Sequence, residues 1–202
     1  MGRIYKPNSK KHQTNEEESD YSDFQKVHYA QSQDDDRVVY LASDLNEHSV
    51  LEVIQSIFSL AKRNTNKPIY LIVSSYGGEC DAMFGLFDCI KFVKCPIYTI
   101  GLGKIMSAAV LILASGQKGH RYIGANARVM LHSIWGGSYG NVFEQHNELE
   151  EMKRLQEQME KRLAEQCETD VETIKNIMKE NKDHYLTANE AVKFNLVDKI
   201  IS

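Results

Sequence analysis

The chain has 202 residues, of which 42% are hydrophobic, and a formal net charge of −4. This composition fits one soluble domain with a sizeable core, and the mildly acidic balance gives no electrostatic case for a nucleic acid or an anionic membrane as partner. No apolar run approaches the roughly 20 residues that cross a bilayer. The four cysteines, Cys80, Cys89, Cys95 and Cys167, form no C-x-x-C pair, which predicts a reducing, cytoplasmic location and no structural metal site.

The first 36 residues differ in composition from the rest of the chain. They are polar and contain the charge blocks EEESD and QDDDR, so we expect residues 1–36 to form a mobile N-terminal arm. From Arg37 onward, RVVYLA, KPIYLIVSS and CPIYTIGLG read as buried strands. The segments HSVLEVIQSIFSLAKRN, CDAMFGLFDCIKFV and SAAVLILASG read as helices between and after them. This alternation predicts an α/β domain over residues 37–202, with a mainly parallel sheet and right-handed crossovers.

The second half of the chain adds short strands in HRYIGANARVMLH, which end at His132, and a glycine-rich loop in WGGSYGN. Residues 144–166 predict one long helix with a single apolar stripe: Leu149, Met152, Leu155, Met159 and Leu163. Such a stripe packs either on its own domain or on another subunit, and the periodicity leaves both open. A helix over 171–179, a capping box from Thr187 to Glu190 before a short helix, and a strand in VDKII complete the chain.

Ser107 stands where the glycine-containing segment IGLGKIM gives way to an Ala-rich helix. A serine at this position is either an ordinary helix N-cap or a nucleophile placed beside the free N–H groups of the helix N-terminus. Lys104 precedes it by three residues and is a second candidate base, although a lysine on a pre-helical turn points more readily to solvent.

The carboxyl ends of parallel strands meet at one edge of a sheet, and that edge gathers Gly78, Ser107 and His132. A nucleophilic serine needs a base within hydrogen-bond reach, and the base needs an orienting carboxylate. His132 fits the base, while Gly78 and Ala108 offer backbone N–H groups for an oxyanion. The competing carboxylates are Asp81, Asp88, Asp183 and Asp198. The glycine pair at 77–78 lacks the residues of a P-loop and the G-x-G-x-x-G spacing, which disfavours nucleotide binding.

Several segments, taken in order, resemble the ClpP family, the proteolytic subunits of Clp ATP-dependent proteases. They are RVVYLASDLNEH, KPIYLIVSSYGGE, GLGKIMSAAVLILASGQKGHRY, NARVMLHS and KDHYLTANEAVKFNLVDKII. The resemblance implies a ClpP/crotonase-like α/β fold of repeated β-β-α units, with a projecting handle over about residues 136–166. It also implies a Ser107–His132–Asp183 triad, in which Asp183 orients His132, and an oxyanion hole made by the Gly78 and Ala108 amides.

The same resemblance implies how such a subunit works with others. Two stacked heptameric rings would enclose the active sites, the handle helices would join the rings, and a hexameric ATPase would unfold and feed protein substrates. No metal or organic cofactor is implied. The residues expected to flank the substrate are Gly77, Gly136, Gly137 and Ser138, and those expected to dock the ATPase are Tyr70, Phe92 and Tyr122.

Two segments, of one and three residues, depart from the family at the expected active site. Tyr76 stands where the family usually has proline, and Lys104, Ile105 and Met106 stand where it usually has small residues or glutamine. The peptide preference of the family therefore does not carry over. Three alternative functions remain open from the sequence: a maturation protease of a viral-type assembly that needs no ATPase, an acyl-CoA enzyme of the crotonase fold, and a catalytically inactive ring subunit.

Overall fold

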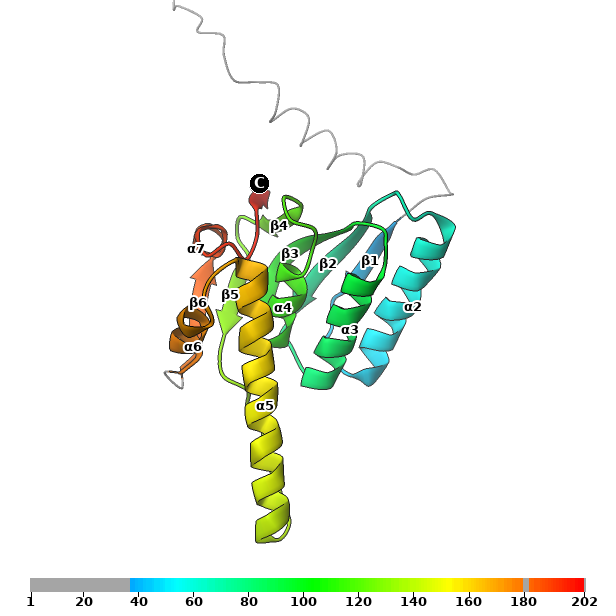
Figure 1. Cartoon of the computed structure of the whole chain (residues 1–202). Helices are drawn as coiled ribbons and strands as arrows, with labels where there is room; N and C mark the ends of the chain where they lie inside the picture. Colours follow the sequence, from blue (N-terminus) through cyan, green and yellow to red (C-terminus); the bar gives the residue numbers. More distant parts are fainter. Residues whose placement is uncertain (1–36, 180–181, 202) are drawn as a thin grey trace, which may run out of the picture. The chain divides into compact units, whose positions relative to one another are not determined.

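A mostly parallel sheet lies at the centre of the computed structural model (Figure 1), which describes residues 37–179 and 182–201. Within these residues the strands are β1 (Val38–Leu41), β2 (Ile69–Ser75), β3 (Ile97–Met106), β4 (Arg121–Gly124), β5 (Arg128–Leu131), β6 (His184–Thr187) and β7 (Lys199–Ile201). The order β1-β2-β3-β4-β7 is parallel throughout, β5 pairs with β3 in parallel, and β6 pairs with β5 antiparallel. The predicted arm, residues 1–36, lies outside the described residues.

The helices of the described part are α2 (Glu47–Arg63), α3 (Cys80–Phe92), α4 (Ala108–Ala114), α5 (Val142–Cys167), α6 (Val171–Lys179) and α7 (Ala188–Lys193). Figure 1 shows α2, α3 and α4 on one face of the sheet, as expected for the crossover helices of a parallel sheet. The predicted α/β class with a mainly parallel sheet is therefore confirmed. None of these helices combines the length and apolarity that a membrane span needs.

The strand β3 is longer than the sequence predicts. We expected it to end at the glycines, but it continues through Gly101 and Gly103 to Met106. Gly101 packs so tightly that an added Cβ would lie 3.0 Å from side-chain atoms of both Ile105 and Leu113. Gly103 has φ +67 and coincides with an irregularity in the β2–β3 register, so it serves as a bulge within the strand rather than as its end. The strand β6 is also absent from the sequence-based prediction, because only Leu186 of its four residues is buried.

The helix α4 forms the hydrophobic centre of the domain. All seven of its residues are buried, and it packs on β2, β3 and β5 from the sheet and on α3 and α5 from the helices. A helix that is apolar on every side is stable only when other elements surround it. This burial fixes the position of the N-terminus of α4, where Ser107 lies.

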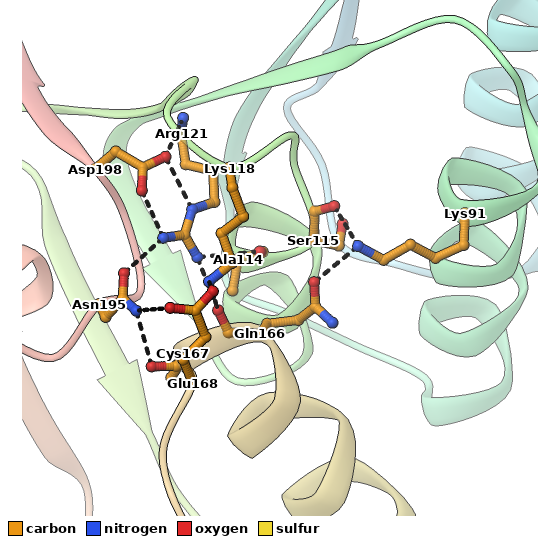
Figure 2. Close-up of polar contacts among 10 residues, drawn as sticks. All are labelled: Lys91, Ala114, Ser115, Lys118, Arg121, Gln166, Cys167, Glu168, Asn195 and Asp198. Carbon is orange, nitrogen blue, oxygen red and sulfur yellow. Dashed lines mark hydrogen bonds and ion pairs between the residues drawn. The ribbon is translucent and has the colours of Figure 1, made fainter.

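Arg121 joins the C-terminal end of α5 to the sheet (Figure 2). Its side chain is 0% exposed and forms an ion pair of 2.6 Å with Asp198, and it also donates to the Gln166 carbonyl oxygen at 3.0 Å and to Asn195 at 2.8 Å. Lys118 bonds to the same Gln166 carbonyl oxygen. Burial alone would raise the pKa of the Asp198 carboxyl, but hydrogen bonds from the side chain and backbone of Arg121, together with its charge, lower the pKa below its ordinary value.

The two ends of α5 have different surroundings. Its C-terminal part buries Met159, Leu163 and Cys167 against the domain, whereas Leu149 and the first turn are exposed. Figure 1 shows the N-terminal part of α5 extending beyond the ends of α2 and α3. The apolar stripe predicted for this helix therefore serves two purposes: one half packs on the chain itself, and the other half is left at the surface.

Candidate active site

Ser107 lies between β3 and α4 in a strained backbone conformation. Its φ of +54 and ψ of −126 fall in a region that residues with a side chain rarely adopt. Its N–H donates to the Met130 carbonyl oxygen at 2.8 Å, which holds the turn against β5. Ser107 occupies the N-cap position of α4, yet its side chain makes no capping hydrogen bond. The hydroxyl group is therefore directed to something other than its own helix.

The partner of this hydroxyl group is His132. Ser107 Oγ lies 2.8 Å from His132 Nε2, which is hydrogen-bond distance. The sheet creates this contact because β3 and β5 are paired up to Met106 and Met130, and Ser107 and His132 are located just beyond those ends. Both residues are half-buried, so the pair is shielded from solvent but reachable by a ligand.

Asp183 directly precedes β6, the strand that pairs with β5 just before His132. In the antiparallel β5–β6 pair, Leu131 lies across from His184, and the next residues beyond that pair are His132 and Asp183. The two side chains are not hydrogen-bonded. The Asp183 carboxylate is exposed and accepts from the Tyr185 hydroxyl group at 3.4 Å, and within the described residues Nδ1 of His132 has no hydrogen-bond partner.

The other three aspartates that compete in the sequence lie elsewhere. Asp198 is held by Arg121 in the buried ion pair. Asp81 and Asp88 lie at exposed positions of α3. The fold therefore brings only Asp183 of these four to the strand that borders His132.

The glycine pair after β2 has neighbouring atoms on both sides that leave no room for a side chain. An added Cβ on Gly77 would lie 2.7 Å from the Cβ of Ser107 and 3.0 Å from the backbone nitrogen of Ala108. An added Cβ on Gly78 would lie 2.1 Å from the Leu45 carbonyl oxygen. Gly77 and Gly78 also have positive φ angles, of +101 and +145. Only glycine fits these two positions without a shift of the backbone.

Two backbone N–H groups near Ser107 are available to a ligand. Leu45 is bridged to the glycine turn by two hydrogen bonds: its N–H donates to the Gly77 carbonyl oxygen, and its carbonyl oxygen accepts from the Glu79 N–H. Within the described residues, the Gly78 N–H donates no hydrogen bond. Ala108 is the first residue of α4, where N–H groups have no partner in the helix.

The loop after His132 runs along α5. The Ile134 N–H donates to Gln156 Oε1 at 2.7 Å, and an added Cβ on Gly136 would lie 3.0 Å from the Met152 methyl carbon. Gln156 in turn donates to Glu160, which is buried, at 2.7 Å. The segment from Gly136 to Ser138 is irregular and exposed. The sequence analysis did not single out Gln156, although its place between Met152 and Met159 on the apolar stripe was a usable signal.

Lys104 is not positioned as a base for Ser107. It lies within β3, and its Nζ is 4.5 Å from the centre of the Tyr76 ring, a cation–π contact. The residues described in the structure contain no group of three or more His, Cys, Asp or Glu side chains arranged to hold a metal ion. The polar groups around Ser107 thus offer a hydroxyl group, an imidazole, a nearby carboxylate and backbone donors.

Comparison with known proteins identifies a family and a curated relative. The model of the Clp protease family matches residues 22–202. A curated relative from Treponema denticola, described as "ATP-dependent Clp protease proteolytic subunit 2", is 32% identical over 165 residues, which cover 81% of this chain and 81% of that protein.

Proposed function

Because the chain belongs to the Clp protease family, and is therefore a serine-type peptidase, we propose that it hydrolyses peptide bonds of unfolded proteins with Ser107, His132 and Asp183. The observation that carries this proposal is the 2.8 Å separation between Ser107 Oγ and His132 Nε2. The absence of a capping hydrogen bond from Ser107 supports it, because the hydroxyl group then has no role in the stability of α4. We assign the activity to residues 37–202.

The reaction follows from these groups. His132 Nε2 accepts the proton of Ser107 as the serine oxygen attacks the substrate carbonyl carbon. His132 then donates that proton to the leaving amine, which releases one product and leaves an ester on Ser107. Water, deprotonated by the same nitrogen, hydrolyses the ester and regenerates the serine.

Asp183 has the role of orienting His132. Its carboxylate would accept the Nδ1 proton, fix the tautomer in which Nε2 is the acceptor, and stabilise the imidazolium that forms. The register of β5 and β6 supports this role, because Leu131 is paired with His184 and the next residues beyond that pair are His132 and Asp183. Catalytic hydrogen bonds are often incomplete in the absence of substrate, so we expect this one to close in the complex.

The developing oxyanion would be held by the N–H groups of Gly78 and Ala108. Such donors act where charge forms in the transition state and need no rearrangement during the reaction. The tight contact of Gly77 with Ser107 and with the Ala108 nitrogen supports this assignment, since it fixes the glycine turn relative to the nucleophile.

Peptide binding would use the backbone on both sides of Ser107. We assign it to Gly77 on one side and to Gly136, Gly137 and Ser138 on the other. An extended peptide between two extended segments gains main-chain hydrogen bonds that do not depend on its sequence. The exposed, irregular backbone of residues 136–138 supports this assignment.

The functional form is a homo-oligomer of two stacked heptameric rings joined through α5. The exposed apolar residues before and along the start of that helix support an assembly, because Trp135 is 89% exposed and further exposed apolar residues follow it in the chain. These further residues are Tyr139, Val142, Phe143 and Leu149.

A hexameric Clp ATPase would unfold substrates and deliver them. Phe92 is 77% exposed and packs edge-on against Phe58, and Tyr70 and Tyr122 lie on the sheet. Aromatic side chains at a surface are typical anchors for a protein partner. We place the protein in the cytoplasm, and the four free cysteines support a reducing compartment. The reaction as written needs no metal or organic cofactor.

Hydrolysis of internally quenched peptides tests the proposal. The wild-type protein should cleave them, and Ser107→Ala should abolish cleavage while native mass spectrometry gives the same assembly. Addition of a Clp-type ATPase and ATP should extend cleavage to a folded reporter protein. Unchanged cleavage by Ser107→Ala would refute the role of Ser107, and cleavage of folded reporter without ATPase would refute the need for that partner.

A further inference from the structure

Two positively charged side chains lie on the same face of the sheet as His132. In β5, Val129 and Leu131 are buried in the core, so Arg128 points to the opposite face. The same alternation, continued one residue past the end of β5, gives His132 that side as well. Lys104 is paired with Arg128 across β3 and β5, and its neighbour Ile105 is buried. Lys104 and Arg128 are therefore adjacent on the face that carries the base.

Each of these two cations is in contact with an aromatic ring. Lys104 Nζ lies 4.5 Å from the centre of the Tyr76 ring, and the guanidinium carbon of Arg128 lies 5.7 Å from that of Tyr185. Tyr76 is 62% exposed and directly precedes Gly77, which is in contact with Ser107. We call these four residues the cationic strip: Tyr76, Lys104, Arg128 and Tyr185.

The charge of the cationic strip is not neutralised within the described residues. Neither Lys104 nor Arg128 has a carboxylate at ion-pair distance there, although the chain as a whole carries a net charge of −4. Like charges at paired positions of adjacent strands destabilise a sheet. An anionic group bound between Lys104 and Arg128 would offset this repulsion, which would account for the two cations beside the active site.

We propose that the cationic strip binds an acidic side chain of the substrate and gives the peptidase a preference for Asp or Glu about three residues from the cleaved bond. Lys104 precedes Ser107 by three residues of extended chain, or roughly 10 Å at about 3.3 Å per residue, which is also the span of three residues of an extended peptide. The proposal rests on the proposed function, since it names the substrates of that same site. Tyr76 and Tyr185 hold the two cations in place and cover their hydrocarbon stems.

The test uses pairs of internally quenched peptides that differ in one residue. Glu or Gln is placed three positions before or three positions after the cleaved bond, and kcat/KM is measured for each peptide. For the wild type we expect kcat/KM to be about fivefold to tenfold higher for Glu than for Gln on one side of the bond, the range given by one or two partly exposed ion pairs. This ratio should fall with added salt, because exposed charges are screened.

Substitutions that remove one charge each show which residues cause the Glu/Gln preference. Lys104→Gln and Arg128→Gln should each reduce the Glu/Gln ratio, and the double variant should bring it close to one while the Gln peptide is still cleaved. Lys62→Gln, which removes the same charge from an exposed position of α2, should leave the ratio unchanged.

Three outcomes would overturn the inference while leaving the proposed function in place. A wild-type ratio of one on both sides of the bond would refute the preference. A preference that persists in the double variant would assign it to other residues. Dissociation of the assembly by Lys104→Gln in native mass spectrometry, with an unchanged ratio in the remaining oligomer, would assign the cations to a contact between copies. Failure of the wild type to cleave any peptide would instead refute the proposed function, and this inference with it.

Discussion

Gly77 lies against Ser107 so closely that a Cβ atom added to the glycine would stand 2.7 Å from the serine Cβ. The Gly77 N–H also donates to the Ser75 hydroxyl group at 3.0 Å, and its carbonyl oxygen accepts from the Leu45 N–H at 2.7 Å. The turn after β2 is thus fixed on one side by Leu45 and on the other by the residue proposed as nucleophile. Any displacement of this turn moves the oxyanion donors relative to Ser107.

The variant Gly77→Ala should therefore lose activity. The methyl group meets backbone and serine atoms that cannot yield, and φ at this position is +101. We expect kcat to fall about 100-fold or more, which is the effect of losing an oxyanion donor. Gly85→Ala is the matched control, because an added Cβ there meets nothing within 4 Å and the residue lies in α3. The control should be as active as wild type; equal activity of both variants would contradict the proposed fit of Gly77.

Asp183→Asn should lower kcat strongly with little effect on KM. The amide cannot stabilise the imidazolium and favours the wrong tautomer of His132, so we expect a loss of about 1,000-fold. Steady-state peptide cleavage measures both parameters. Asp88→Asn, at an exposed position of α3, is the control and should have no effect. A full-activity Asp183→Asn variant would show that another group orients His132.

Gln156→Ala should weaken catalysis through the loop that follows His132. The variant removes the acceptor of the Ile134 N–H and leaves the buried Glu160 without its partner. Because the loop holds the proposed peptide-binding residues, KM should rise about tenfold, corresponding to the loss of roughly one hydrogen bond. Gln158→Ala, two residues further along α5 and exposed, is the control. Equal KM values for both variants would show that this hydrogen bond does not position the loop.

The Arg121–Asp198 ion pair should make stability depend on acid pH. The pKa of Asp198 is lowered in the folded state, so the folded protein binds fewer protons than the unfolded chain. The stabilisation is fully present above the unfolded-state pKa of about 4, and it is lost as the pH falls through the folded-state pKa. Asp198→Asn leaves the fully buried Arg121 without a counter-charge and should lower the free energy of unfolding by about 3 kcal/mol at pH 7.

Denaturant unfolding of wild type and Asp198→Asn between pH 7 and pH 3 measures this difference, which should narrow as the pH falls. Asp88→Asn serves again as the exposed control. A difference that is constant over this range would contradict the assigned linkage.

The sequence predicts the parts of this fold that follow from side-chain periodicity. The helix over residues 171–179 and the Thr187–Glu190 capping box appear where expected, because each depends on residues close together in the chain. The full length of β3 and the existence of β6 were not predicted. In the sequence, Gly101 and Gly103 suggest that the strand ends there, and only their tertiary neighbours show that it continues. The strand β6 is defined by its pairing with β5 rather than by its own composition.

The candidate site, like the fold, can be predicted from the sequence only in part. Strand topology alone brings Ser107 and His132 to one edge, but it does not choose among four aspartates. The choice needs the antiparallel register of β5 and β6, which depends on contacts between residues more than 50 positions apart. The contacts of Lys104 with Tyr76 and of Gln156 with Ile134 are likewise tertiary contacts.

The proposed nucleophile is tested most directly with a fluorophosphonate probe and intact-mass measurement of the assembled protein. Wild type should gain the mass of one probe per chain, Ser107→Ala should gain none, and Asp183→Asn should react more slowly. Labelling of Ser107→Ala at the wild-type rate, or no labelling of assembled wild type, would contradict the assignment of Ser107 as an activated nucleophile.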